Sequence, residues 1–175
     1  MTTKEKPNET SRIIQLFLDN CKTRDYHPEK DNEFDFRYKI RIWGENGYLT
    51  SIVTFDAVKE YVFVQVILIL NFLKSTLSEL CKLTNEINNK YVSSKLVINT
   101  EENYVALEAI KRYAEIGAIK YLWKDIDLAV DILDFYIPAF HLVGYGTMGA
   151  DKALETVERL SFADEMEEAM EELPN

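Results

Sequence analysis

The sequence predicts one α+β domain in which an antiparallel sheet is packed by helices, in the order α-β-β-β-α-β-β-α, plus an extra C-terminal helix. Three observations indicate this fold. Apolar and charged residues alternate over residues 34–42, which is the period of a half-buried strand. Two more strand-like segments follow after short reversals, so these strands form a meander. Apolar spacing of three and four residues, typical of helices, returns on both sides of that block.

The first helix is expected to run from a cap at Thr10 or Ser11 to Thr23. Its apolar stripe consists of Ile13, Ile14, Phe17, Leu18 and Cys21. Residues 1–9 are polar and are expected to form a disordered tail. They contain no apolar segment of a secretory signal, which indicates a cytoplasmic protein.

The meander comprises residues 34–42, 48–55 and 61–69, with a glycine-containing turn at 44–47. One face of the first strand is charged and is expected to be solvated; it is formed by Asp35, Arg37, Lys39 and Arg41. The third strand is apolar on both faces, so we expect both to be covered. One of these faces, formed by Tyr61, Phe63, Ile67 and Ile69, would offer the largest partner-binding surface if helices did not fully cover it, but we favour a core role. The run is shorter than the roughly 20 apolar residues of a membrane-spanning helix.

The second half of the chain begins with a helix over 75–91, which Ser75 or Thr76 could cap together with Glu79. A hairpin and a long helix over 120–143 follow, and Pro138 either kinks that helix or ends it one turn early. The glycine-rich segment 144–149 terminates it, because the strand–turn–helix context of a phosphate loop is missing. We expect one domain over 10–145 and an acidic C-terminal helical extension over 146–175.

The composition bears on partners and cofactors. Thirty acidic against 20 basic residues give a net charge of −10, which argues against a nucleic acid or an anionic membrane as partner. Cys21 and Cys81 form no CxxC motif, and His27 and His141 are far apart, so neither a metal site nor a cofactor is expected. Both thiols are expected to be buried in a reducing compartment.

No catalytic residue is assigned. The two histidines have no evident partner, and the chain lacks the GxSxG of a nucleophile elbow. Asp127, Asp131 and Asp134 share one helical face, which is either a site for a cation or basic partner or, as we favour, a solvated surface. The alternative function is small-ligand binding or catalysis between the long helix and the sheet, with Tyr121, Trp123, Asp127 and His141 as contributors.

Asn85 and Asn88 lie in a helix whose apolar positions include Asn88. A buried amide left unpaired costs about 1–3 kcal/mol, so it must find partners. We favour a structural role, in which the asparagines tie the helix to an adjacent strand or loop, over a ligand site.

The meander ending in YVFVQVILI, the segment LTNEINNKY, the hairpin KLVINTEENYVALEAI and the proline-interrupted DFYIPAFHLV together resemble the YbjN family of bacterial sensory transduction regulators. The resemblance covers roughly residues 10–145. It implies a fold shared with type III secretion chaperones, which are acidic α+β proteins that dimerise and bind polypeptide segments without enzymatic chemistry. We therefore expect a cytoplasmic, homodimeric, non-enzymatic protein-binding or regulatory module. Its partner would lie on a sheet edge or an apolar helix face.

Overall fold

The structure, a computed structural model, describes residues 9–91, 95–113 and 120–171. The predicted order of helices and strands is confirmed, and the predicted tail lies almost entirely outside the described residues. The helices are α1 (Glu9–Thr23), α2 (Leu77–Lys90), α3 (Lys120–Gly144) and α4 (Ala150–Glu171), with a 3-10 turn η1 (Lys74–Thr76) before α2. The strands are β1 (Glu29–Lys30), β2 (Arg37–Trp43), β3 (Tyr48–Asp56), β4 (Tyr61–Ile69), β5 (Lys95–Asn99) and β6 (Tyr104–Arg112).

The strands form one six-stranded sheet in the order β1-β2-β3-β4-β6-β5, and every neighbouring pair is antiparallel. The predicted meander and hairpin are therefore present, and β4 lies inside the sheet between β3 and β6. The two-residue β1 was not predicted, because its sequence carries no strand period; it pairs with β2 through Glu29 opposite Lys39.

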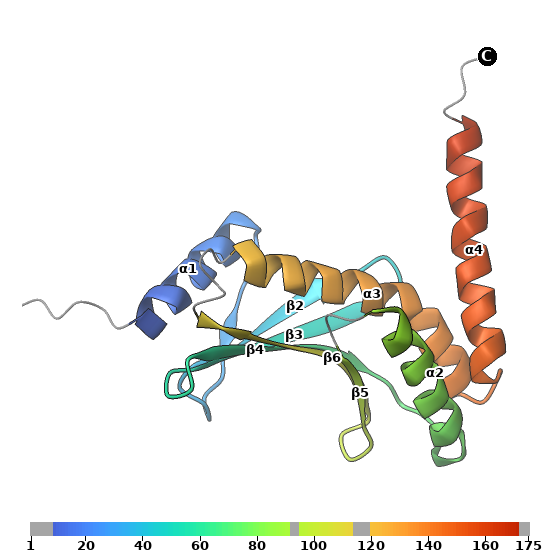
Figure 1. Cartoon of the computed structure of the whole chain (residues 1–175), viewed down its shortest axis with the longest axis horizontal. Helices are drawn as coiled ribbons and strands as arrows, with labels where there is room; N and C mark the ends of the chain where they lie inside the picture. The colour runs from blue at the N-terminus through green and yellow to red at the C-terminus, as the bar shows by residue number, and fades with distance from the viewer. Residues whose placement is uncertain (1–8, 92–94, 114–119, 172–175) are drawn as a thin grey trace, which may run out of the picture.

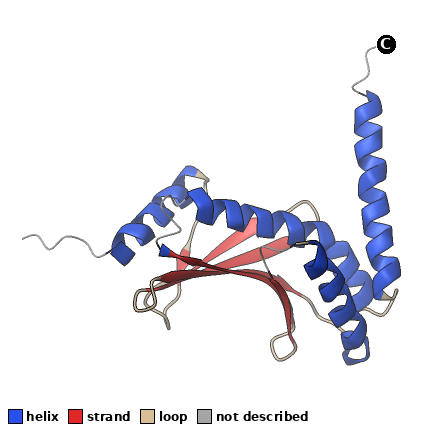
Figure 2. Ribbon diagram, in the orientation of Figure 1, coloured by secondary structure: helices blue, strands red, loops and turns tan. Residues whose placement is uncertain are grey.

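Helices α1, α2 and α3 all lie on one side of the sheet (Figure 1; Figure 2). The hydrophobic core fills the space between these helices and the sheet. Val62, Val64 and Val66 of β4 are buried there against the helix layer. No described residue forms a helix on the other side (Figure 2). The expectation that both faces of β4 are covered is therefore wrong for the described chain. Apolar residues on both faces show that burial is favourable there, but they do not specify what provides the cover.

Phe17 anchors α1 in this core. It is fully buried, and its ring centroid lies 5.4 Å from that of Phe55 and 5.7 Å from that of Trp123. The apolar stripe of α1 is confirmed by the burial of Ile13, Ile14, Phe17 and Cys21. The helix begins at Glu9, so Thr10 and Ser11 lie inside it rather than before it.

The other helix boundaries differ in detail from the predictions. Thr76 makes no capping bond to α2; its hydroxyl donates to the carbonyl oxygens of Leu73 and Gly144. Glu79 instead accepts from the backbone N–H of Ala150, at 2.8 Å, in the first turn of α4. Helix α3 continues through Pro138 to Gly144, and the chain then turns at Gly146, whose φ is +72°.

The first turns of α4 pack against α2 and α3, and the helix then projects away from the sheet (Figure 1). Ala150, Ala153 and Val157 are its buried residues at that contact. Ion pairs from α2 support the contact, namely Lys82 with Asp151 at 2.6 Å and Lys90 with Glu158. None of the described helices is long and apolar enough to cross a membrane.

Candidate functional site

The uncovered side of the sheet is the largest candidate surface, and we refer to it as the open face. It comprises Glu29 of β1 and every second residue of the other five strands. These are the residues of β2 from Arg37 to Trp43, of β3 from Tyr48 to Asp56, of β4 from Tyr61 to Ile69, of β6 from Tyr104 to Arg112, and of β5 from Lys95 to Asn99. Antiparallel pairing sets these side chains in rows across the strands. One row, for example, consists of Thr54, Phe63 and Ile110.

Three large apolar side chains on the open face are exposed, whereas Ile67 in the middle of β4 is buried. Trp43 is 80% exposed, Ile69 66% and Ile110 63%. Ile52, Tyr61 and Phe63 are half-buried, since their cross-strand neighbours shield them partly. Single exposed apolar residues are ordinary, but a group of them on one surface marks a site of interaction. The open face therefore has the character of a docking surface.

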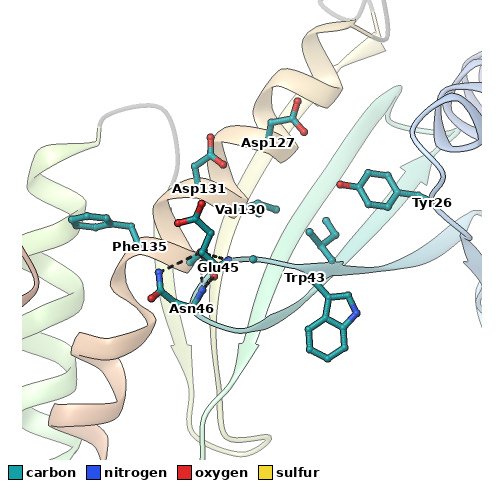
Figure 3. A pocket seen from close by; sticks show the side chains of 11 residues that line it. Tyr26, Trp43, Glu45, Asn46, Asp127, Val130, Asp131 and Phe135 are labelled. Carbon is teal, nitrogen blue, oxygen red and sulfur yellow. Dashed lines mark hydrogen bonds between the residues drawn. The ribbon is translucent and has the colours of Figure 1, made fainter. Parts of the chain in front are cut away.

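A pocket of about 620 Å³ lies beside the open face, between α3 and the β2–β3 turn (Figure 3). Trp43 borders both surfaces. The lining residues are Tyr26, Ile42, Trp43, Gly44, Glu45, Asn46, Asp127, Val130, Asp131, Asp134 and Phe135. Four of them are acidic and none is Lys, Arg or His, so the pocket has a negative lining with aromatic walls.

Asp134 fastens α3 to the β2–β3 turn. Its carboxylate accepts from the backbone N–H of Glu45 at 2.9 Å and from that of Asn46 at 3.1 Å. The approach requires glycine at position 44, because a Cβ there would lie 2.0 Å from Asp134 Oδ1. Asp134 is buried, so the expectation of a solvated aspartate face is wrong for this residue.

The other two aspartates of that helical face have different environments. Both oxygens of Asp127 accept from the Arg24 guanidinium, at 2.7 and 2.9 Å. The central carbon of the Arg24 guanidinium lies 4.6 Å from the centre of the Trp123 ring. Asp131 is exposed. The pocket thus contains carboxylates that mainly organise the fold. Among the described residues, no group of His, Cys, Asp and Glu is placed to hold a metal ion.

The four residues of the alternative ligand site do not converge. Trp123 is only 1% exposed and stacks with Phe17 and Tyr26, with centroids 5.7 Å apart in each case. Tyr121 is exposed, and Asp127 pairs with Arg24. His141 lies near the other end of α3, where its ring stacks with Tyr145 at 5.5 Å.

Asn88 has the structural role that the sequence favoured. Its amide nitrogen donates to the carbonyl oxygen of Leu96 at 3.0 Å, and its amide oxygen accepts from the N–H of Leu96 at 2.7 Å. This pair of bonds ties α2 to the edge strand β5. Asn85 is exposed and does not share that role.

The two cysteines differ. Cys21 is buried, and burial raises the pKa of its thiol to about 11. Cys81 is exposed, so the expectation that both thiols are buried is wrong. Its position in α2 follows the apolar spacing, but the helix layer does not cover that side of α2.

Comparison with known proteins gives a likeness of fold. No family model and no curated protein sequence matches the chain. The ExsC–ExsE complex contains a similar chain, with a TM-score of 0.54 and 11% identity over 73% of this chain and 92% of that one. YbjN from E. coli, a proposed transcription regulator, gives a TM-score of 0.50 and 6% identity over 69% of this chain and 85% of YbjN. The YbjN-like, type III secretion chaperone-like α+β fold is thereby confirmed.

Proposed function

We propose that this protein is a non-enzymatic module that binds a polypeptide partner on the open face of its sheet, in a chaperone-like or regulatory role. The observation that carries the proposal is the one-sided helix layer: β4 is buried on one face and presents Phe63 and Ile69 on the other. Covering apolar surface contributes roughly 25 cal/mol per Å², so a partner that covers this face gains binding energy.

The likeness of fold supports a binding role. One of the two similar structures is a complex of two components, ExsC and ExsE. A fold alone does not define a function, so the assignment rests on the open face and not on the neighbours.

The placement of the polar residues favours binding over catalysis. Tyr121, Trp123 and His141 do not line the pocket that contains Asp127. Inside the pocket, the carboxylates of Asp127 and Asp134 are occupied by an arginine and by backbone N–H groups. A general base needs a free position within hydrogen-bond reach of its substrate, and these two groups do not offer one.

We further propose that the protein is a cytoplasmic homodimer, as the resemblance to the YbjN family implies. The net charge of −10 supports a protein partner over nucleic acid or an anionic membrane. Light scattering distinguishes the oligomeric states, since the chain has a mass of 20.4 kDa and a dimer has twice that mass. A single species at the mass of one chain would contradict the dimer.

Site-specific photo-crosslinking tests the binding surface. Benzoylphenylalanine is placed at Trp43 or Ile110 on the open face, and at Tyr121 on α3 as a control that is also exposed. We expect adducts with another polypeptide from the two open-face positions, in the cells that produce the protein, and little from Tyr121. Equal adducts at all three positions, or none on the open face, would contradict the proposal.

A further inference from the structure

The open face carries a charge of the opposite sign to the whole chain. Its basic side chains are Arg37, Lys39 and Arg41 of β2, Lys95 of β5 and Arg112 of β6. Its acidic side chains are Asp56 of β3, Glu108 of β6 and Glu29 of the edge strand β1, which lies opposite Lys39. The chain as a whole has a net charge of −10, so this excess of basic residues sets the open face apart from the remaining surface.

Three of the basic residues form a column along β2. Arg37, Lys39 and Arg41 occupy alternate positions, so their Cα atoms are roughly 7 Å apart. Their cross-strand neighbours on β3 are Thr54, Ile52 and Thr50, respectively. The column therefore runs beside the apolar middle of the open face.

Each residue of the column has a partner within the chain, and Arg37 donates to the Thr54 hydroxyl at 3.2 Å and lies over the Phe34 ring. Lys39 lies 3.7 Å from Asp31, and Arg41 lies 3.2 Å from Glu29. In the Arg41–Glu29 pair both side chains are more than half exposed. An exposed pair of this kind contributes about 0–1 kcal/mol, so a partner's carboxylate can replace Glu29 beside Arg41 at little cost.

All three acidic groups of the open face are engaged, Glu29 through its pair with Arg41. Asp56 accepts from the backbone N–H groups of Lys59 and Val58 in the β3–β4 turn, and these bonds, that of Lys59 foremost, lower the pKa of its carboxyl. Glu108 accepts from Gln65 at 2.8 Å and lies opposite Lys95. A molecule that approaches the open face therefore meets apolar side chains flanked mainly by cations.

We propose that the open face binds an acidic amphipathic helix, with the apolar stripe of the helix on Ile52, Phe63 and Ile110 and its carboxylates toward the β2 column. This inference deepens the proposed function and rests on it. The interior strands have their backbone groups paired within the sheet, so the open face offers side chains rather than main-chain bonds. A helix matches such a surface, as α1 and α3 do on the other side (Figure 1).

The test uses two synthetic helical peptides with the same leucine stripe, one flanked by glutamates and the other by lysines at the same positions. Trp43 reports docking through a shift of its emission to shorter wavelength, because it is 80% exposed while the other tryptophan, Trp123, is buried. We expect the glutamate peptide to bind at least tenfold more tightly than the lysine peptide at low salt. The preference should fall toward unity at 1 M salt, where the screening length is about 3 Å.

Charge-reversal variants locate the interaction. The triple variant R37E/K39E/R41E should reverse the preference between the peptides. The control R12E/K22E/K124E, which changes exposed residues of α1 and α3, should leave it unchanged. Unfolding midpoints in urea establish that both variants are folded.

Three outcomes would overturn this inference. They are equal affinity for both peptides, no emission shift with either peptide, or a wild-type dimer that R37E/K39E/R41E separates, which would make a second copy the occupant. The proposed function fails separately, when photo-crosslinking gives no open-face adduct. An adduct combined with equal peptide affinities would retain the open face as the binding surface and reject its preference for acidic partners.

Discussion

The two faces of β4 are both rich in apolar residues but differ in exposure. Val62, Val64 and Val66 point into the helix layer and are buried. On the open face Phe63 is half-buried and Ile69 is two-thirds exposed, although Ile67 between them is buried. Both faces are apolar, so composition does not distinguish them. The difference arises because the helices of this chain lie on one side only (Figure 2). A group of exposed apolar residues on one surface is typical of interaction sites, and the proposed binding role rests on this difference.

The largest loss of stability is expected from a substitution in the core between the helices and the covered face of the sheet. Phe17→Ala removes a fully buried ring that contacts Phe55 and Trp123, and the cavity that remains should lower the free energy of unfolding by about 3–5 kcal/mol. Urea unfolding measures the loss. A decrease below about 1 kcal/mol would show that α1 does not seal the core as described.

A smaller effect is expected where α3 meets the end of the sheet. Asp134→Ala leaves the N–H groups of Glu45 and Asn46 without their acceptor, and bonds to a charged group contribute about 1.5–3 kcal/mol. The matched control Asp131→Ala removes an exposed carboxylate and should change stability by less than about 0.5 kcal/mol. Equal losses in the two variants would contradict the anchoring role of Asp134.

A substitution on the open face should weaken partner binding without lowering the stability of the fold. Ile110→Thr changes a mostly exposed side chain and should alter the free energy of unfolding by less than about 0.5 kcal/mol. The same variant should reduce crosslinking from Trp43, because the apolar middle of the docking surface is weakened. A loss of stability comparable to that of Phe17→Ala would show that another part of the chain covers Ile110.

The two cysteines allow buried and exposed positions to be compared without any substitution. Since the pKa of Cys21 is raised to about 11, its thiol stays protonated at pH 8, and the thiolate is the nucleophile. Iodoacetamide should therefore modify the exposed Cys81 in the folded protein and reach Cys21 only after unfolding. Mass spectrometry of peptides from the treated protein separates the two sites. Equal modification of both cysteines before unfolding would contradict the burial of Cys21.

Much of the fold was predictable from local patterns. The period of two over residues 34–42 predicts β2, although Phe34 and Phe36 lie before the strand and are exposed. The stripe of α1 and the amide role of Asn88 follow from spacing in the same way. These features depend on neighbours close in sequence, which is why they can be inferred without a structure.

The site was less predictable because it depends on contacts distant in sequence. The partners of Asp134 are backbone N–H groups in a turn almost ninety residues earlier, and helical spacing carries no signal for them. Glu79 likewise bonds to Ala150 rather than to its own helix. The open face was predicted only as the less favoured alternative to a core face, for a related reason. Alternation defines which side chains share a face, but not on which face the helices pack.

Hydroxyl-radical footprinting of the purified protein, at a concentration where light scattering establishes its mass, shows whether the open face is uncovered. We expect strong labelling of Trp43 and Ile110 on the open face and weak labelling of Trp123 and Phe17 in the core. Addition of a binding partner should protect Trp43 and Ile110 from labelling, while Tyr121 on α3 stays labelled. Protection of the open face in the isolated chain, at the mass of a single copy, would contradict the account.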